Sequence, residues 1–198
     1  MKLAYLGWGA LGAAGLWLLC GGRRKLALPL LTVGDSIAEG IGQAVERLAQ
    51  GQALTLAQSG EGVEATASRL TARLRASAEA RSVVLSTGVN SLSGASDSAV
   101  EVMRETVEVV RRIRETGREV ILVGPPPAFG MDDKSDAWRE QLVILERLHG
   151  RMTPRVSLFQ LLGDERRVGY FDAEYGTPGG LHPNRAGYER VAAAILGR

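Results

Sequence analysis

Ser36 and His182 are the residues of this sequence best suited to nucleophilic chemistry. Ser36 closes the run Val33-Gly34-Asp35-Ser36, where an apolar segment gives way to an amphipathic one. His182 is one of only two histidines, and it lies on a turn before the last amphipathic segment. Ester chemistry by a serine needs a hydroxyl exposed at a sharp bend and an imidazole that takes its proton. The two residues together predict a serine hydrolase.

Two further segments contain residue types that would complete such a site. Ser59-Gly60-Glu61-Gly62 follows the second predicted strand, and a glycine there lets a backbone amide approach a reacting oxygen closely. Thr87-Gly88-Val89-Asn90-Ser91 follows the third strand, and Asn90 could point its side-chain amide at the same place. Each segment alone is also an ordinary turn or cap sequence. Their order at the ends of successive strands favours a shared site.

The elements that must position these residues are apolar runs alternating with amphipathic ones from residue 26 onward. Strands are predicted over residues 26–33, 53–57, 82–86, 119–123 and 156–161. Helices are predicted over residues 37–48 and along apolar faces that begin at Val63, Val100, Trp138 and Tyr188. Such alternation indicates a parallel sheet covered on both faces, with ligands at the carboxyl ends of the strands. The serine, glycine and asparagine segments and the loop 125–129 all fall at those ends.

The N-terminal segment differs from the rest of the chain. Residues 3–20 carry no charge, and a helix of that length at about 1.5 Å per residue spans roughly 27 Å, close to a bilayer core. Because the residues before Cys20 are large, we expect a retained membrane anchor rather than a cleaved or lipidated signal. Basic residues 23–25 favour a cytoplasmic domain, whereas signal-anchors export the domain attached to them; we expect the extracytoplasmic side. Residues 1–25 are then anchor and linker, and 26–198 the domain.

The bulk composition fits one α/β domain with this appendage. The chain has 198 residues, of which 45% are apolar and 23% charged, and its formal net charge is +2. A charge this small gives no reason to expect nucleic acid as a partner. The one cysteine, Cys20, excludes an internal disulfide. No metal or cofactor is implied. His149 has no ligand partners, and we expect it on the outer part of a helix as a surface residue.

With these residues in place, the chain resembles the SGNH hydrolases, also called the GDSL esterase/lipase family. Gly34-Asp35-Ser36 matches the family's serine block, and residues 181–188 (Leu-His-Pro-Asn-Arg-Ala-Gly-Tyr) closely match its histidine block. Ser59-Gly60 resembles the glycine block, and Gly88-Val89-Asn90 resembles the asparagine block. The resemblance covers residues 28–197. It implies a three-layer α/β/α, flavodoxin-like fold with a parallel five-stranded sheet, preceded here by the anchor helix.

The resemblance implies a carboxylic ester hydrolase that works through an acyl-enzyme on Ser36, with His182 as the base. The family's oxyanion hole corresponds here to the backbone amides of Ser36 and Gly60 and the side chain of Asn90. The substrate would be a small-molecule, lipid or glycan ester, such as a lysophospholipid or an O-acetyl group of a cell-envelope glycan. Two alternatives stay open: an O-acyltransferase, and a catalytically weakened, membrane-anchored binding domain of the same fold.

One position departs from the family pattern. Gly179 stands three residues before His182, where the family usually has the Asp that orients the imidazole. A backbone carbonyl could orient the ring, Asp172 or Glu174 could do so from the preceding loop, or catalysis could be weakened. Loss of such an acid lowers the rate but leaves the oxyanion hole intact, which favours the first explanation.

Overall fold

The computed structural model describes residues 28–93, 98–128, 136–152, 154–178 and 180–198. The expected anchor over residues 3–20 and the departure at Gly179 both lie outside these ranges. Within them, no helix is both long enough and apolar enough to cross a membrane.

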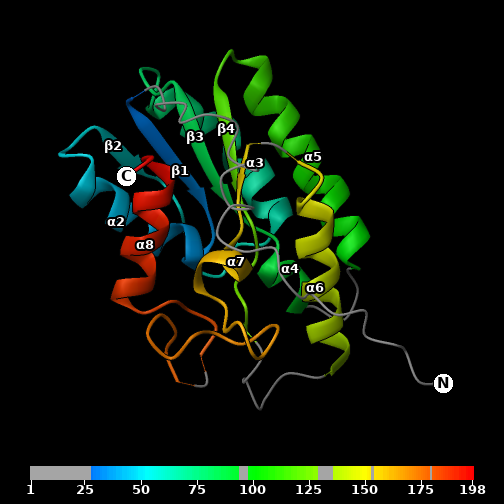
Figure 1. The fold of residues 1–198 in the computed structure, drawn as a ribbon. Helices are drawn as coiled ribbons and strands as arrows, with labels where there is room; N and C mark the ends of the chain where they lie inside the picture. Colours follow the sequence, from blue (N-terminus) through cyan, green and yellow to red (C-terminus); the bar gives the residue numbers. More distant parts are fainter. Residues whose placement is uncertain (1–27, 94–97, 129–135, 153, 179) are drawn as a thin grey trace.

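A parallel five-stranded sheet forms the middle layer (Figure 1). Its strands are β1 (Leu30–Gly34), β2 (Ala53–Thr55), β3 (Ser82–Ser86), β4 (Glu119–Val123) and β5 (Arg155–Val156). Their order across the sheet is β2-β1-β3-β4-β5, the flavodoxin-like order. All residues of β1 and β3 are buried, because these strands are covered on both faces. The predicted parallel sheet of five strands is confirmed.

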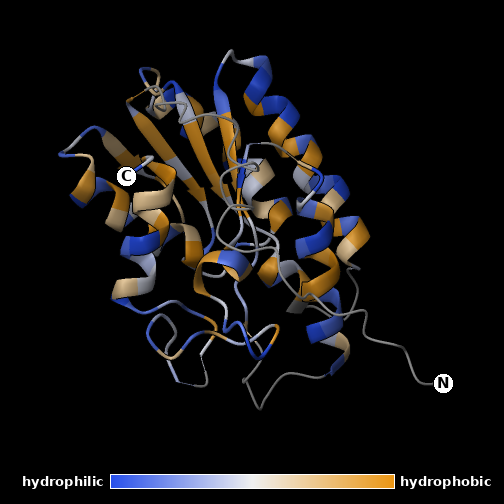
Figure 2. Cartoon of the chain, viewed as in Figure 1, coloured by the Kyte–Doolittle hydropathy of each residue, from blue (hydrophilic) through white to orange (hydrophobic). Residues whose placement is uncertain are grey.

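Helices cover both faces of this sheet (Figure 1). One face carries α2 (Ser36–Leu48), α7 (Leu158–Leu162) and α8 (Arg185–Ile195). The other carries α3 (Val63–Ala76), α4 (Val89–Ser93), α5 (Ala99–Glu115) and α6 (Asp136–His149). Figure 2 shows apolar residues concentrated on the strands and on the sides of the helices that face them. The predicted three-layer arrangement is therefore confirmed.

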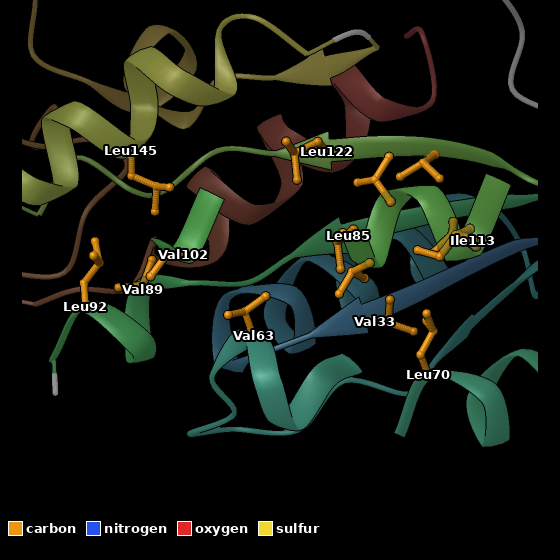
Figure 3. Packing of buried hydrophobic residues seen from close by; sticks show 14 of the residues in the cluster. Val33, Val63, Leu70, Leu85, Val89, Leu92, Val102, Ile113, Leu122 and Leu145 are labelled. Atoms are coloured by element: carbon orange, nitrogen blue, oxygen red, sulfur yellow. The ribbon is translucent and has the colours of Figure 1, made fainter. Parts of the chain in front are cut away.

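The core on the α3–α5 face shows how the amphipathic patterns are satisfied (Figure 3). Val33 of β1, Leu85 of β3 and Leu122 of β4 are almost fully buried there. They belong to the same packed cluster as Leu70 of α3 and Ile113 of α5, which are buried to a similar degree. This packing holds the carboxyl ends of three adjacent strands in fixed positions, and the candidate site lies at those ends.

The strand predicted over residues 156–161 is wrong beyond its first residue. β5 ends at Val156, and residues 158–162 form the short helix α7. Ser157 causes the change, because its hydroxyl accepts a hydrogen bond from the backbone N–H of Gln160 at 3.2 Å and so caps a helix. Leu158 and Leu162, four residues apart, are then buried on one helical face.

The expectation that His149 lies on the outer part of a helix is also wrong. Its side chain, at the end of α6, is fully buried. His149 follows Leu145 by four residues and Leu142 by seven, so it lies on the helical face that those leucines bury.

Candidate functional site

Ser36 is the first residue of α2 and follows β1 through a tight turn. Gly34 has a φ of +136°, and a Cβ there would lie 1.7 Å from the carbonyl oxygen of Ser86, so only glycine fits. Asp35 caps the helix, because its Oδ1 accepts hydrogen bonds from the backbone of Ile37 at 2.9 Å and Ala38 at 3.3 Å. The turn thus places the serine hydroxyl at a helix N-terminus, where developing negative charge is favoured.

His182 is held by the loop that precedes α8. Its carbonyl oxygen accepts hydrogen bonds from the backbone N–H and the hydroxyl of Thr177, at 3.3 Å and 2.9 Å. Asn184 caps α8 by accepting from the Gly187 N–H at 3.0 Å, and its amide donates to the carbonyl of Glu174 at 2.8 Å. The histidine is therefore fastened to its loop on one side and to a helix start on the other.

The structure brings the imidazole and the hydroxyl together across 146 positions of sequence. His182 Nε2 lies 2.8 Å from Ser36 Oγ, and the pair is partly buried. This is the distance at which an imidazole can take a proton from an attacking hydroxyl. Both groups face the carboxyl end of the sheet, as their positions after β1 and before α8 predict.

Asn90, in the first turn of α4, lies against the segment that follows β2. Its Nδ2 donates a hydrogen bond to the carbonyl oxygen of Glu61 at 3.1 Å. The segment itself is tied to the nucleophile turn, since the N–H of Gln58 donates to the carbonyl of Gly34 at 2.9 Å. The asparagine, the glycine segment and the serine turn are therefore neighbours.

Gly60 is exposed in this segment, with a φ of +81°. Gly62 lies closer to the asparagine side of the site: it is the N-cap of α3, and a Cβ on it would come within 2.8 Å of Ser91 Oγ. The glycine predicted from sequence is Gly60; Gly62, which directly precedes the apolar helical pattern beginning at Val63, is a second glycine in the same segment.

Asp172 and Glu174, the two carboxylates expected as possible partners of His182, do not contact its ring through a hydrogen bond among the described residues. Asp172 Oδ1 accepts a hydrogen bond from the backbone N–H of Glu174 at 2.8 Å, which closes a local turn. Glu174 itself is exposed. Across the described part of the chain, neither carboxylate is hydrogen-bonded to His182. The group that orients the imidazole therefore stays a prediction, with Gly179 outside the described residues.

Asp35 gives the site an unusual electrostatic neighbour. Burial raises the pKa of this carboxyl group to about 7, against the hydrogen bonds from Ala38 and Ile37, which lower it. The group next to the serine is thus neutral in mildly acidic solution and becomes charged near neutrality. No cluster of three or more metal-ligating side chains occurs in the part of the chain that the structure describes.

Known proteins share both the sequence pattern and the fold. The sequence model of the GDSL-like lipase/acylhydrolase family matches residues 32–190. A GDSL-like lipase from Bacteroides thetaiotaomicron VPI-5482 is similar in structure, with a TM-score of 0.68, 18% identity and coverage of 84% of each chain. A lipase/acylhydrolase from Enterococcus faecalis has a TM-score of 0.63 and 20% identity, over 84% of this chain and 93% of that one.

An acetyl xylan esterase is also similar in structure, with a TM-score of 0.60 and 17% identity over 84% of this chain and 96% of the other. No curated protein matches the chain in sequence. At such low identities the solved structures establish the fold, and the family rests on the sequence match over residues 32–190.

Proposed function

The chain belongs to the GDSL-like lipase/acylhydrolase family, and we propose that it is a serine esterase acting through Ser36 and His182. Family membership supports ester hydrolysis in general. The observation that carries the specific proposal is the 2.8 Å contact between His182 Nε2 and Ser36 Oγ. A purely structural role for His182 would not explain why its ring contacts the hydroxyl of Ser36, the first residue of α2.

In the proposed reaction, Ser36 Oγ attacks the ester carbonyl while His182 Nε2 takes its proton. The carbonyl π electrons move to the oxygen, giving a tetrahedral oxyanion. When that intermediate collapses, the bond to the alkoxy group breaks, and the imidazolium protonates the departing alcohol. Water, deprotonated by the same imidazole, then attacks the acyl-enzyme. The bond between the acyl carbon and Ser36 Oγ breaks, and the imidazolium returns the proton to Oγ, which releases the acid and restores the free serine.

We propose that the oxyanion is held by the backbone N–H of Ser36, the side-chain amide of Asn90 and a backbone N–H of the glycine segment. Gly60 is the donor expected from sequence, and Gly62, at the start of α3, is the alternative that its position beside Ser91 supports. One donor of this kind is typically worth roughly 3 kcal/mol of transition-state stabilisation.

The imidazole would work without a carboxylate partner. Asp172 and Glu174 have no hydrogen bond to His182 among the described residues, and Gly179 supplies no acid, so we propose a Ser-His dyad with a backbone carbonyl orienting the ring. Because Ser36, Asn90 and His182 are all present, catalytic turnover is favoured over the alternative of a weakened binding domain.

The substrate class is an acyl or acetyl ester of a small molecule, a lipid or a glycan. The two candidates are an O-acetyl group on a cell-envelope glycan and a lysophospholipid. An acetyl xylan esterase among the structural relatives is consistent with the first. An O-acyltransferase differs only in the acceptor that replaces water. Attachment to a membrane through residues 3–20 belongs to the proposal as well.

Hydrolysis of p-nitrophenyl acetate and butyrate tests this function, with Ser36→Ala and His182→Ala beside the parent chain. We expect both variants to lose at least roughly a thousandfold in kcat, since neither partner can act alone. Activity unchanged in Ser36→Ala would exclude the serine as nucleophile. A folded parent without activity would favour the transferase or the binding domain.

A further inference from the structure

Glu61 is a buried carboxylate beside the proposed oxyanion hole, and two arginines bind it. Its side chain is only 3% exposed, and that of Arg73 is 10% exposed. Arg73 donates two hydrogen bonds, Nη1 to Oε2 and Nη2 to Oε1, each at 2.8 Å. Arg69 binds the same carboxylate from the surface side. Burial alone would raise the pKa of Glu61, but these arginines hold it below its usual value, so the group is ionised at neutral pH.

The same residue is bonded to Asn90 through its main chain. The Glu61 carbonyl oxygen is the acceptor for Asn90 Nδ2 at 3.1 Å. A bidentate arginine–carboxylate pair is directional, so it fixes the orientation of the residue that carries it. Glu61 is thus held by its side chain from α3 and holds the asparagine by its backbone.

Two hydroxyl contacts connect the same two segments. Thr66 Oγ1 donates to Glu61 Oε2 at 3.3 Å and lies 3.3 Å from the hydroxyl of Thr87, which directly follows β3. On the other side, the backbone N–H of Val63 donates to Ser91 Oγ at 2.9 Å. The start of α3 and the asparagine segment are therefore joined on both sides of the Asn90 contact.

We infer that Glu61, paired with Arg73, is a positioning residue that aims the Asn90 amide at the oxyanion. The inference rests on the proposed esterase function. A side-chain amide carries two hydrogens on one nitrogen, so a bond from one to a fixed carbonyl sets the direction of the other. Donors that are oriented before the reaction stabilise the transition state without the cost of reorganisation. A merely structural ion pair would contribute to folding stability alone.

A double-mutant cycle on the full chain separates these roles. We expect Asn90→Ala to lower kcat for p-nitrophenyl acetate about 100-fold, as loss of an oxyanion donor does. Glu61→Gln alone should lower kcat roughly tenfold with KM within about twofold, and in the Asn90→Ala background by less than about twofold, because residues that act through each other are not additive. An equal fall in both backgrounds, or no fall in the single variant, would overturn the inference.

Arg118→Met is the matched control. Arg118 donates to the carbonyls of Ala80 at 2.9 Å and Leu74 at 3.0 Å, far from the carboxyl ends of the strands. It should lower the melting temperature and leave kcat within about twofold in both backgrounds, since well-separated sites are additive. If Glu61→Gln does not fold, because Arg73 is left buried and unpaired, the cycle is run with Glu61→Met/Arg73→Met, and the same coupling with Asn90→Ala is expected.

The two proposals fail in different ways. A wild-type chain without esterase activity, or an Asn90→Ala variant with unchanged kcat, would overturn the oxyanion hole and this inference with it. A 100-fold effect of Asn90→Ala without coupling to Glu61 would overturn this inference alone.

Discussion

Asp35 is both the N-cap of α2 and a buried carboxyl group. It is 1% exposed, and its Oδ1 caps α2 directly before the proposed nucleophile. Its Oδ2 is buried and has no hydrogen-bond partner among the described residues. Burial therefore raises its pKa from 3.8 to about 7, although the capping bonds favour the charged form. Burial favours the neutral carboxyl group and the capping hydrogen bonds favour the carboxylate. Because burial has the larger effect, the free energy of unfolding depends on pH.

We predict that the free energy of unfolding contains a contribution from Asp35 that is complete below pH 4 and lost as the pH rises through about 7. In that window the folded chain binds the proton more tightly than the unfolded chain, and the pKa difference corresponds to at most roughly 4 kcal/mol. Asp35→Asn keeps the capping oxygen and cannot ionise, so its stability should not fall over this range. Urea unfolding at intervals from pH 4 to pH 8 measures the difference, and parallel curves for the two proteins would contradict it.

The contribution of His149 to the free energy of unfolding depends on pH in the opposite direction to that of Asp35. The ring is fully buried, and neither nitrogen has a hydrogen-bond partner in the described ranges. Burial and the nearby charge of Arg155 lower its pKa from 6.5 to about 4. Its contribution is therefore complete above pH 6.5 and is lost as the pH falls toward 4, because the unfolded chain takes up the proton first.

We predict that His149→Leu removes this acid-induced loss. The variant should be less sensitive than the parent to a change from pH 7 to pH 5, and its activity at pH 7 should be retained because the residue lies outside the proposed site. The measurement is the midpoint of urea unfolding at both pH values. Combined with Asp35→Asn, the two substitutions should act on the pH curve in opposite directions; effects of the same sign would exclude this account.

At the scale of elements, α2 and α8 carry the two halves of the proposed dyad. α2 begins at Ser36, and α8 follows the loop of His182. The helices pack closely where Gly40 faces Tyr188, since a Cβ on Gly40 would lie 2.2 Å from the tyrosine ring. The close approach of α2 and α8 therefore depends on a glycine one helical turn beyond the serine.

We predict that Gly40→Ala destabilises the fold by about 1–3 kcal/mol, the usual range for an overpacked contact. An exposed helical glycine would show the reverse sign, because alanine is the better helix former by up to about 1 kcal/mol. The same substitution in a Tyr188→Ala background should be tolerated. Thermal unfolding of the four proteins gives the coupling, and additive effects of the two changes would show that the ring is not the obstacle.

The elements also show how far the sequence predicts the structure. β3 and β4 have the bounds that the sequence predicts, because continuous apolar runs between turn residues leave little choice. Ser36 and His182 meet as predicted because both lie at the carboxyl edge of a parallel sheet. The ion pair of Glu61 with Arg73 is not predictable in this way, since a charged residue in a turn looks solvated until α3 packs over it. A polar residue at a helix end suggests exposure, which is why the sequence-based prediction for His149 is wrong. Its spacing to Leu142 and Leu145 is the signal that indicates burial.

At the scale of the whole molecule, the described chain enters the sheet at the amino ends of the strands, and the proposed site lies at their carboxyl ends. β1 runs from Leu30 toward Ser36, and its five residues at about 3.3 Å each separate these two ends by roughly 17 Å. Figure 1 shows β1, in blue, running from the top of the sheet toward the lower part, where the loop before α8 is drawn in orange. The segment before Leu28 therefore joins the domain far from the dyad.

This arrangement predicts that the N-terminal segment and the chemistry are separable. If residues 3–20 attach the chain to a membrane, the full chain should sediment with the membrane fraction and a chain that starts at Lys25 should stay in the supernatant. Their kcat/KM values for p-nitrophenyl acetate should agree within about twofold, because the described chain enters the domain at the end of β1 opposite the dyad. Equal sedimentation would remove the anchor from the proposal. A large loss of activity in the shorter chain would mean that the segment reaches the site, since the packing of β1 gives no other reason for it.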